Sequence, residues 1–269
     1  ANTTGIRNTA TGNQALMVNT TANDNTAVGQ SALAANTGAD NTAVGKGAMS
    51  ANTSGAFNTA VGFSAMSGTS AGYSRNVAMG YQALGAATNA AYNVGIGMWA
   101  GQSLTSGGEC TYVGYQAGKY STGANSTFMG SGAGAGTSSY SAQNNTAVGQ
   151  DALRNVSGAG NTAIGHGAGN VITSSPSNTC LGRDTDPSSA TSGGHEIAIG
   201  ANATGKGSST GFMNANGGGN YAGNNSASWS TTSDRRIKKN IADSNVGLAE
   251  INQIQVRNFE YRLPDEVDA

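Results

Sequence analysis

The sequence predicts an all-β fold, a parallel β-solenoid (β-roll) of about twelve coils, and two observations support it. First, a motif that closes on glycine, most often Asn-Thr-Ala-Val-Gly, recurs about every 17 residues along most of the chain. A short, fixed period over so many copies is typical of repeat proteins in which each repeat forms one coil. Second, 42 of the 269 residues are glycine and only 10% are charged, a composition that is poor for a globular core. The twelve closing glycines are Gly12, Gly29, Gly45, Gly62, Gly80, Gly97, Gly114, Gly130, Gly149, Gly165, Gly182 and Gly200.

The motif itself predicts one short strand in each coil. The positions three and one before the glycine carry β-branched or aliphatic residues in nearly every copy, as Thr59 and Val61 do. Because these positions are two apart, their side chains point to the same face of a strand. The residue between them ranges from Gly95 to Phe128, and such tolerance is typical of an open position. The sequence therefore predicts that the β-branched and aliphatic pair faces the core.

The rest of the repeat predicts turns. Asparagine lies four residues before the glycine in nine of twelve copies, where its amide can close a turn or stack as a ladder along the coils. The glycine suits a corner with positive φ. Alanine follows three residues later in eleven copies, and a second turn such as Asn36-Thr37-Gly38 comes after it.

A coil of this kind offers few large apolar side chains. A single roll would therefore bury little apolar surface for each residue that it orders. We expect a homotrimer in which identical coils pack around an axis.

The chain divides into three segments by composition. Residues 1–204 hold the repeats, residues 205–232 form a Gly/Ser/Asn-rich connector, and residues 233–269 hold 13 of the 27 charged residues. In this last segment Leu248, Ile251 and Ile254 are spaced as on one helix face, so a short mixed α/β segment is expected.

Charge and hydropathy exclude two classes of partner. The net charge is −1 and no basic stripe is present, so nucleic-acid binding is not expected. No apolar run has the length of a membrane span, so no membrane insertion is expected. Cys110 and Cys180 lie four coils apart, about 20 Å along the stack, which is too far for a disulfide.

No cofactor and no metal site are expected. His166 and His195 have no second ligand at metal spacing. The acidic residues Asp184, Asp186 and Glu196 could approach a cation in an irregular loop, but nothing in the sequence fixes their geometry. No pair of carboxylates stands out for glycoside cleavage, so no activity on external substrates is expected.

The carboxy-terminal segment carries a more specific motif. Residues 229–241 read Trp-Ser-Thr-Thr-Ser-Asp-Arg-Arg-Ile-Lys-Lys-Asn-Ile, and apolar residues continue the pattern to residue 264. This stretch resembles the start of the self-cleaving intramolecular chaperone of phage tailspikes and tail fibres, the endosialidase-type C-terminal domain. The family's domain is much longer than the 37 residues present here. The repeats are similar to the trimeric β-roll heads of trimeric autotransporter adhesins, whose repeats also end in Ala-Ile-Gly or Ala-Val-Gly.

The chaperone resemblance implies a single self-cleavage. In that family the serine at the position of Ser233 attacks the peptide bond before it, and the lysine at the position of Lys238 is its base. A lysine can act in this way once burial lowers its pKa. The alternative is that Ser233 caps a short helix and Lys238 lies on its solvated face.

Aromatic residues predict a binding surface in the middle coils. Eleven of the 16 aromatic residues lie between Phe57 and Tyr140. The position after the corner glycine carries Phe63, Tyr81, Met98 and Tyr115 in four successive coils, which stacking would bring into one column with Trp99, Tyr112 and Tyr120 nearby. Two interpretations stay open: Phe63, Tyr81, Trp99 and Tyr115 bind a receptor, or the column is buried between chains of the trimer.

Together these features predict a structural and receptor-binding distal segment of a viral (phage) tail fibre or tailspike. It would lie on the virion tail, trimerise with help from the chaperone, and bind a glycan or protein receptor on the host surface. The alternative is a bacterial surface adhesin or an extracellular filament subunit. A third possibility is an ice-binding solenoid with a threonine ladder, but the threonines interchange with Val77, Val94 and Ile197, which favours an inward orientation.

Overall fold

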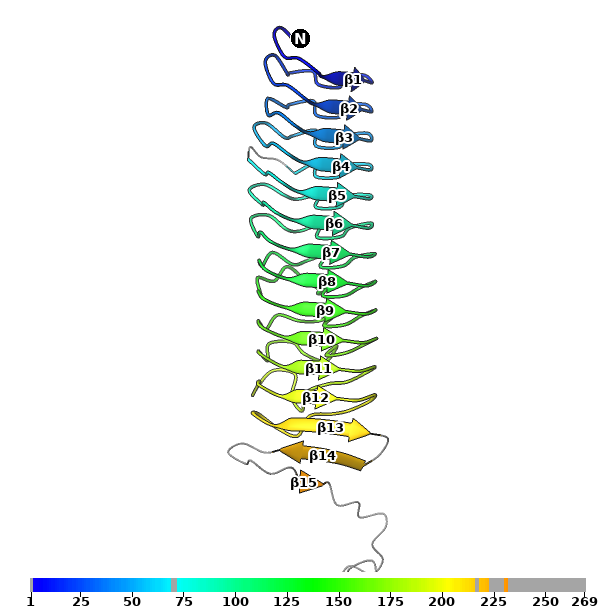
Figure 1. The fold of residues 1–269 in the computed structure, drawn as a ribbon, viewed down its shortest axis with the longest axis vertical. Coiled ribbons are helices and arrows are strands. Elements are labelled where there is room, and N and C mark those ends of the chain that lie inside the picture. The colour runs from blue at the N-terminus through cyan, green and yellow to red at the C-terminus, as the bar shows by residue number, and fades with distance from the viewer. Residues whose placement is uncertain (1, 69–71, 216–217, 223–229, 232–269) are drawn as a thin grey trace, which may run out of the picture. The chain divides into compact units, whose positions relative to one another are not determined.

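The computed structural model describes residues 2–68, 72–215, 218–222 and 230–231, and it shows a parallel β-solenoid (Figure 1). The chain divides into residues 1–232 and 233–269, and the second unit lies outside the described residues, with the mixed α/β segment expected there. The described residues form no helix, and so none that could cross a membrane.

Each of the twelve coils contributes one strand of three residues to a single sheet. Every strand pairs in parallel with the next coil's strand, in an unbroken register such as Thr59 opposite Val77 and Val61 opposite Met79. The strands are β1 (Thr9–Thr11), β2 (Thr26–Val28), β3 (Thr42–Val44), β4 (Thr59–Val61), β5 (Val77–Met79), β6 (Val94–Ile96), β7 (Thr111–Val113), β8 (Thr127–Met129), β9 (Thr146–Val148), β10 (Thr162–Ile164), β11 (Thr179–Leu181) and β12 (Ile197–Ile199).

The sheet continues into the segment expected to be a connector. Strand β13 (Gly211–Ala215) pairs in parallel with β12. Strand β14 (Gly218–Ala222) then reverses direction against β13, and β15 (Ser230–Thr231) pairs antiparallel with β14 (Figure 1).

The sequence prediction of which strand face is buried was wrong. In β4 the central residue Ala60 is fully buried, whereas Thr59 and Val61 are only half-buried. The same pattern holds from β2 to β11: the central side chain faces the core, and the β-branched and aliphatic pair faces outward.

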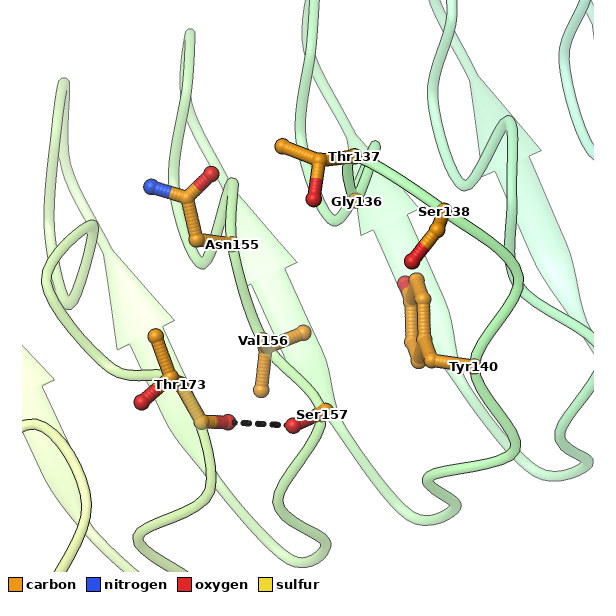
Figure 2. A pocket seen from close by; sticks show the side chains of 8 residues that line it. All are labelled: Gly136, Thr137, Ser138, Tyr140, Asn155, Val156, Ser157 and Thr173. Atoms are coloured by element: carbon orange, nitrogen blue, oxygen red, sulfur yellow. Dashed lines mark hydrogen bonds between the residues drawn. The ribbon is translucent and has the colours of Figure 1, made fainter.

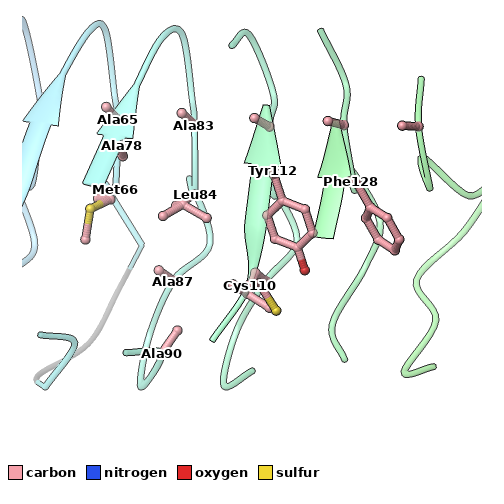
Figure 3. Close-up of a cluster of buried hydrophobic side chains, with 14 of the residues drawn as sticks. Ala65, Met66, Ala78, Ala83, Leu84, Ala87, Ala90, Cys110, Tyr112 and Phe128 are labelled. Carbon is pink, nitrogen blue, oxygen red and sulfur yellow. The ribbon is translucent and has the colours of Figure 1, made fainter. Parts of the chain in front are cut away.

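The physical reason is a compensation of side-chain size inside the coil. The position four residues after the corner glycine is a buried leucine or methionine in six of the eight coils whose strand centre is alanine, as for Ala147 and Leu153. Where the centre is Tyr112 or Phe128, the same position is glycine, and a Cβ added to Gly118 would lie 2.4 Å from the Tyr112 ring. Figure 3 shows these rings filling the space that Met66 and Leu84 fill in earlier coils. Where the centre is Gly95, the same position is Gly101, and neighbouring coils fill the space: an added Cβ would lie 2.8 Å from Leu84 at Gly95 and 2.4 Å from the Tyr112 ring at Gly101. A closed interior can thus accept both glycine and phenylalanine at the strand centre.

The asparagine column forms a buried ladder along the coils. The Oδ1 atom of Asn58 accepts a hydrogen bond from the backbone N–H of Asn76 in the next coil at 3.1 Å. Its Nδ2 group donates to the carbonyl of Tyr73 at 2.9 Å. Asn58 therefore satisfies a donor and an acceptor of the next coil's backbone at the point where the turn enters the strand. The ladder positions that are not asparagine are Cys110, Ser126 and Glu196.

The corner glycines are required by the close stacking of the coils. Gly62 has φ +135°, and a Cβ added to it would lie 2.5 Å from the carbonyl oxygen of Gly80. Both the backbone conformation and the space therefore exclude a side chain at this corner.

Candidate binding surface

The outward sheet face presents two parallel columns of side chains. The last residue of each strand forms what we call the aliphatic column, and seven of its members are between 36% and 44% exposed. These seven are Val28, Val44, Met79, Ile96, Met129, Ile164 and Leu181. The first residues of the strands form a second column, mostly of half-buried threonines. The solenoid thus carries a long apolar row on its surface.

A row of four aromatic rings lies just beyond the end of the strands in the middle coils. Phe63 and Tyr81 stack with centroids 5.4 Å apart and planes 6° from parallel. The ring of Trp99 then lies 6.0 Å from Tyr81 at 81°, and Tyr115 lies 5.9 Å from Trp99 at 46°. We call these four residues the aromatic strip. The structure brings together the four aromatic residues that the sequence suggested, and Trp99 rather than Met98 continues the row of rings.

Two glutamines fix the orientation of the tryptophan. The indole Nε1–H of Trp99 donates to Oε1 of Gln82 at 3.0 Å, and Nε2 of Gln102 donates to the same oxygen at 2.9 Å. Gln82 comes from the preceding coil, whereas Gln102 lies three residues after Trp99 in the same coil and contacts the indole's partner. Sequence reasoning missed these amides, because their positions in the repeat carry no common residue.

The charged groups beside the strip are lysines. Nζ of Lys119 lies 4.6 Å from the centroid of Trp99 and 4.8 Å from that of Tyr120, and Nζ of Lys46 lies 5.9 Å from that of Phe63. Glu109 is the one acidic residue of the sequence between Lys46 and Gly149, and it lies in the turn before β7, at the opposite end of the strand. The strip is therefore flanked by positive charge.

Comparison with models of protein families, with curated proteins and with solved structures finds no match to this chain. A functional interpretation therefore rests on the chain's own sequence and geometry.

Tyr112 does not belong to the surface, although the sequence placed it near the aromatic column. Its ring is fully buried against Phe128, with centroids 5.6 Å apart, because the residue is the centre of β7. Its hydroxyl contacts Oγ of Ser121 at 3.3 Å, and burial raises the pKa of the phenol. Tyr120 is partly buried and packs against the core.

A second aromatic group lies at the other end of the strands. The guanidinium of Arg75 lies between the rings of Phe57 and Tyr92, 5.4 Å and 5.5 Å from their centroids. All three residues have φ near +60° and come from the turns before β4, β5 and β6. Their spacing of one repeat, five residues before the corner glycine, could have revealed this group in the sequence.

The structure also contains a pocket where the turn after β8 is longer than in other coils. It has a volume of about 220 Å³ and is lined by polar side chains around Tyr140 and Val156 (Figure 2). The hydroxyl of Tyr140 donates to the carbonyl of Gly134, and Ser157 Oγ donates to the carbonyl of Thr173 at 3.1 Å. The lining holds no ionised group, so the pocket offers hydrogen bonds but no acid or base. Its lining residues are Gly136, Thr137, Ser138, Tyr140, Asn155, Val156, Ser157 and Thr173.

The residues suggested for catalysis, Ser233 and Lys238, lie outside the described residues. Within the described part of the chain, no group of three His, Cys, Asp or Glu residues is placed to hold a metal ion. The Nδ1 atom of His166 lies 3.3 Å from Oδ1 of Asp184, and His195 is exposed. Glu196 is buried and accepts hydrogen bonds from the backbone N–H and the hydroxyl of Ser188 at 2.9 and 2.7 Å.

Both cysteines are free and buried. Burial raises the pKa of the Cys180 thiol to about 12, which keeps it protonated and unreactive at neutral pH. Cys110 takes an asparagine's place in the ladder, and its thiol contacts the carbonyls of Gly108 and Gly123 at 3.4 Å.

Proposed function

We propose that this chain forms the rod of a phage tail fibre or tailspike, that it assembles as a homotrimer, and that it presents a receptor-binding surface to the host. The observation that carries the proposal is the aliphatic column, an exposed apolar row that runs along the coils from β2 to β11. Large exposed apolar surfaces mark interaction sites on soluble proteins.

The aliphatic column repeats once per coil, and this period favours a second copy of the same chain as its partner. The column places one aliphatic side chain on each coil from β2 to β12, in the register of the parallel sheet. A partner that fits it along its whole length needs the same spacing between coils, and another copy of this chain has that spacing. The resemblance of the repeats to trimeric adhesin heads, and of residues 229–264 to a trimeric chaperone, supports three copies.

The phage origin rests on the chaperone resemblance. The alternative is that the chain is a bacterial surface adhesin or filament subunit, which would use the same rod at the bacterial surface. The neighbouring genes in the source genome separate the two proposals.

The outward threonines favour one further candidate, an ice-binding face. The objection from the sequence was that the threonines face inward, and the structure shows Thr42, Thr59 and Thr162 on the outer face. However, valines interrupt the threonine column at β5 and β6, and side chains of unequal length, from valine to methionine, stand beside it. This unevenness favours a protein interface. Thermal hysteresis of the purified protein would support the ice-binding candidate.

Self-association is tested by charge substitutions in the aliphatic column. Ile96→Lys combined with Met129→Lys places two ammonium groups in the proposed interface, and we expect native mass spectrometry to show dissociation to monomers. The matched control is Ser106→Lys with Ser139→Lys, which adds the same charge in exposed turns and should leave the trimer intact. A wild-type protein that is a stable, folded monomer at micromolar concentration contradicts the proposal.

The self-cleavage proposed from the resemblance is tested separately in a full-length parent chain. Ser233→Ala or Lys238→Ala should leave the bond between Thr232 and Ser233 intact, as read by mass spectrometry. Two fragments from that bond in either variant would exclude the pair.

A further inference from the structure

We propose that the aromatic strip, with Lys46 beside Phe63 and Lys119 beside Trp99, is a binding site for an acidic polysaccharide, a glycan chain that carries carboxylates. This inference rests on the proposed host-attachment role, because it names the class of receptor that the fibre would contact.

The orientation of the rings favours an anionic ligand. Phe63 and Tyr81 stack nearly parallel, so each ring covers one face of the other, while both residues stay more than 40% exposed. The edges of this stacked pair are therefore more accessible to a ligand than the two faces that meet. Ring edges carry the positive part of the aromatic quadrupole, so this end of the strip attracts negative charge weakly over an apolar surface.

The two lysines supply full positive charges for the same ligand. Neither Lys46 nor Lys119 forms an ion pair with any of the residues that the structure describes. Instead, the ammonium of Lys119 lies over the indole of Trp99, and that of Lys46 lies over Phe63. Both ammonium groups are thus held beside the strip and are available to a ligand carboxylate.

The remaining groups suit sugar hydroxyls. Gln82 and Gln102 join the indole N–H in one hydrogen-bonded cluster, which restricts the rotamers of all three side chains. A surface fixed in this way loses little conformational entropy on binding. The exposed side chains of Tyr81 and Tyr115 add phenol hydroxyls to the same strip.

The limited extent of the strip separates it from the proposed trimer interface. At the position after the corner glycine, Phe63 to Tyr115 are large and apolar, whereas coils outside this region carry Gln30, Ser131 and Gln150. An interface between identical rods would use the column that repeats in every coil. Phe63 and Tyr81 also cover one face of each other, which leaves fewer faces for the bases of a single-stranded nucleic acid and disfavours that other class of anionic polymer.

The test compares a uronate polymer with its neutral counterpart. Oligomers of polygalacturonate and the same oligomers fully methyl-esterified share one backbone and differ in carboxylate charge. We expect isothermal titration calorimetry of the assembled protein to show binding of the acid form, weakened by salt, and at least about tenfold weaker binding of the ester.

Variants assign the binding to the strip. Lys119→Gln and Trp99→Ala should each weaken polygalacturonate binding by at least about tenfold and leave the oligomer mass and the Tm unchanged. The matched control is Tyr92→Ala, which removes an exposed ring at the other end of the strand and should leave binding unchanged.

Several outcomes overturn the inference. Equal binding of acid and ester, no binding of either by an intact oligomer, or binding of a single-stranded oligonucleotide in place of the glycan each exclude an acidic polysaccharide site. Loss of the oligomer in Trp99→Ala assigns the strip to an interface instead. A native mass that shows wild-type monomers refutes the proposed fibre assembly, and it does so independently of the calorimetry.

Discussion

At the scale of the residue, the identity of each coil's strand centre decides how the interior is filled. Ala60 is fully buried, whereas Val61, its neighbour in β4, is half-buried on the outer face. Ala60→Asp should place a carboxylate in the core without a partner and destabilise the fold by about 3–5 kcal/mol.

Val61→Asp is the matched comparison for this prediction. The carboxylate introduced at position 61 would lie on the outer face, so we expect a small loss of unfolding free energy for the isolated chain and weaker self-association. Urea denaturation followed by circular dichroism measures the first effect, and native mass measures the second. A larger loss of unfolding free energy for Val61→Asp than for Ala60→Asp would contradict the observed orientation.

The size compensation can be tested by exchanging its two partners. Phe128→Ala alone should cost about 3–5 kcal/mol through the cavity that it leaves. Gly134→Leu alone should also destabilise, because a Cβ there would lie 2.6 Å from the Phe128 ring. The double variant reproduces the native pair Ala147 and Leu153, and Leu153 has the same left-handed backbone, φ +49° against +55° for Gly134.

We therefore expect the double variant to be more stable than the sum of the two single changes by about 2–3 kcal/mol. Gly47→Ala is a control for the backbone alone, because Gly47 has φ +69° and its nearest neighbour to an added Cβ is 3.5 Å away. It should cost about 1–2 kcal/mol. Additive single effects in urea denaturation would contradict the compensation.

The repeat could be predicted from the sequence, but the direction of its side chains could not. The period of 17 residues determines the coil and the strand, because spacing is visible in a single sequence. The orientation depends on pairs such as Phe128 and Gly134, six residues apart and joined by a corner. A position that accepts glycine and phenylalanine is taken for an open one unless the side chains packed against it, in its own and the neighbouring coils, are considered with it.

The same limit applies to the candidate site. The column of Phe63, Tyr81 and Tyr115 follows from the period alone, because equivalent positions stack in successive coils. The amides of Gln82 and Gln102 and the ammonium of Lys119 come from turn positions that vary between repeats. Their approach to Trp99 depends on side-chain rotamers, which no spacing in the sequence specifies.

At the scale of the element, the asparagine ladder joins the start of each strand to the next coil. Asn58→Ala removes an acceptor for the backbone N–H of Asn76 and a donor to the carbonyl of Tyr73, and both partners are buried. Leaving such groups unsatisfied should cost about 1–3 kcal/mol each in unfolding free energy.

Serine offers a conservative comparison at the same position. In the native ladder Ser126 Oγ accepts the backbone N–H of Asn145 at 3.3 Å and donates to the carbonyl of Ala124 at 3.2 Å. Asn58→Ser should therefore lose less stability than Asn58→Ala, as measured by urea denaturation. Equal losses would show that the amide ladder contributes through packing alone.

At the scale of the whole molecule, the buried tyrosines make the solenoid sensitive to alkaline pH. Burial raises the pKa values of Tyr73, Tyr112 and Tyr140 above the ordinary tyrosine value of about 10, and it raises that of Cys180 to about 12. In each case the folded protein holds the proton more tightly than the unfolded chain does. The unfolding free energy should therefore stay level up to about pH 9 and fall as the pH rises further.

Tyr73→Phe tests this dependence in one coil. The change removes the hydrogen bond from the hydroxyl to the carbonyl of Met66, 2.8 Å in the structure, so it should cost about 1 kcal/mol at neutral pH. It also removes one phenol that must stay protonated in the folded state, so the decline in stability above pH 10 should be shallower than in the wild type.

The matched control is Tyr92→Phe, a change at an exposed ring, which should follow the wild-type curve. The measurement is the unfolding free energy from urea denaturation at pH values from 7 to 11. A change in one coil alters this value because the stability of a solenoid depends on the contact between each pair of neighbouring coils. Parallel curves for Tyr73→Phe and the wild type above pH 10 would show that this phenol does not couple ionisation to unfolding.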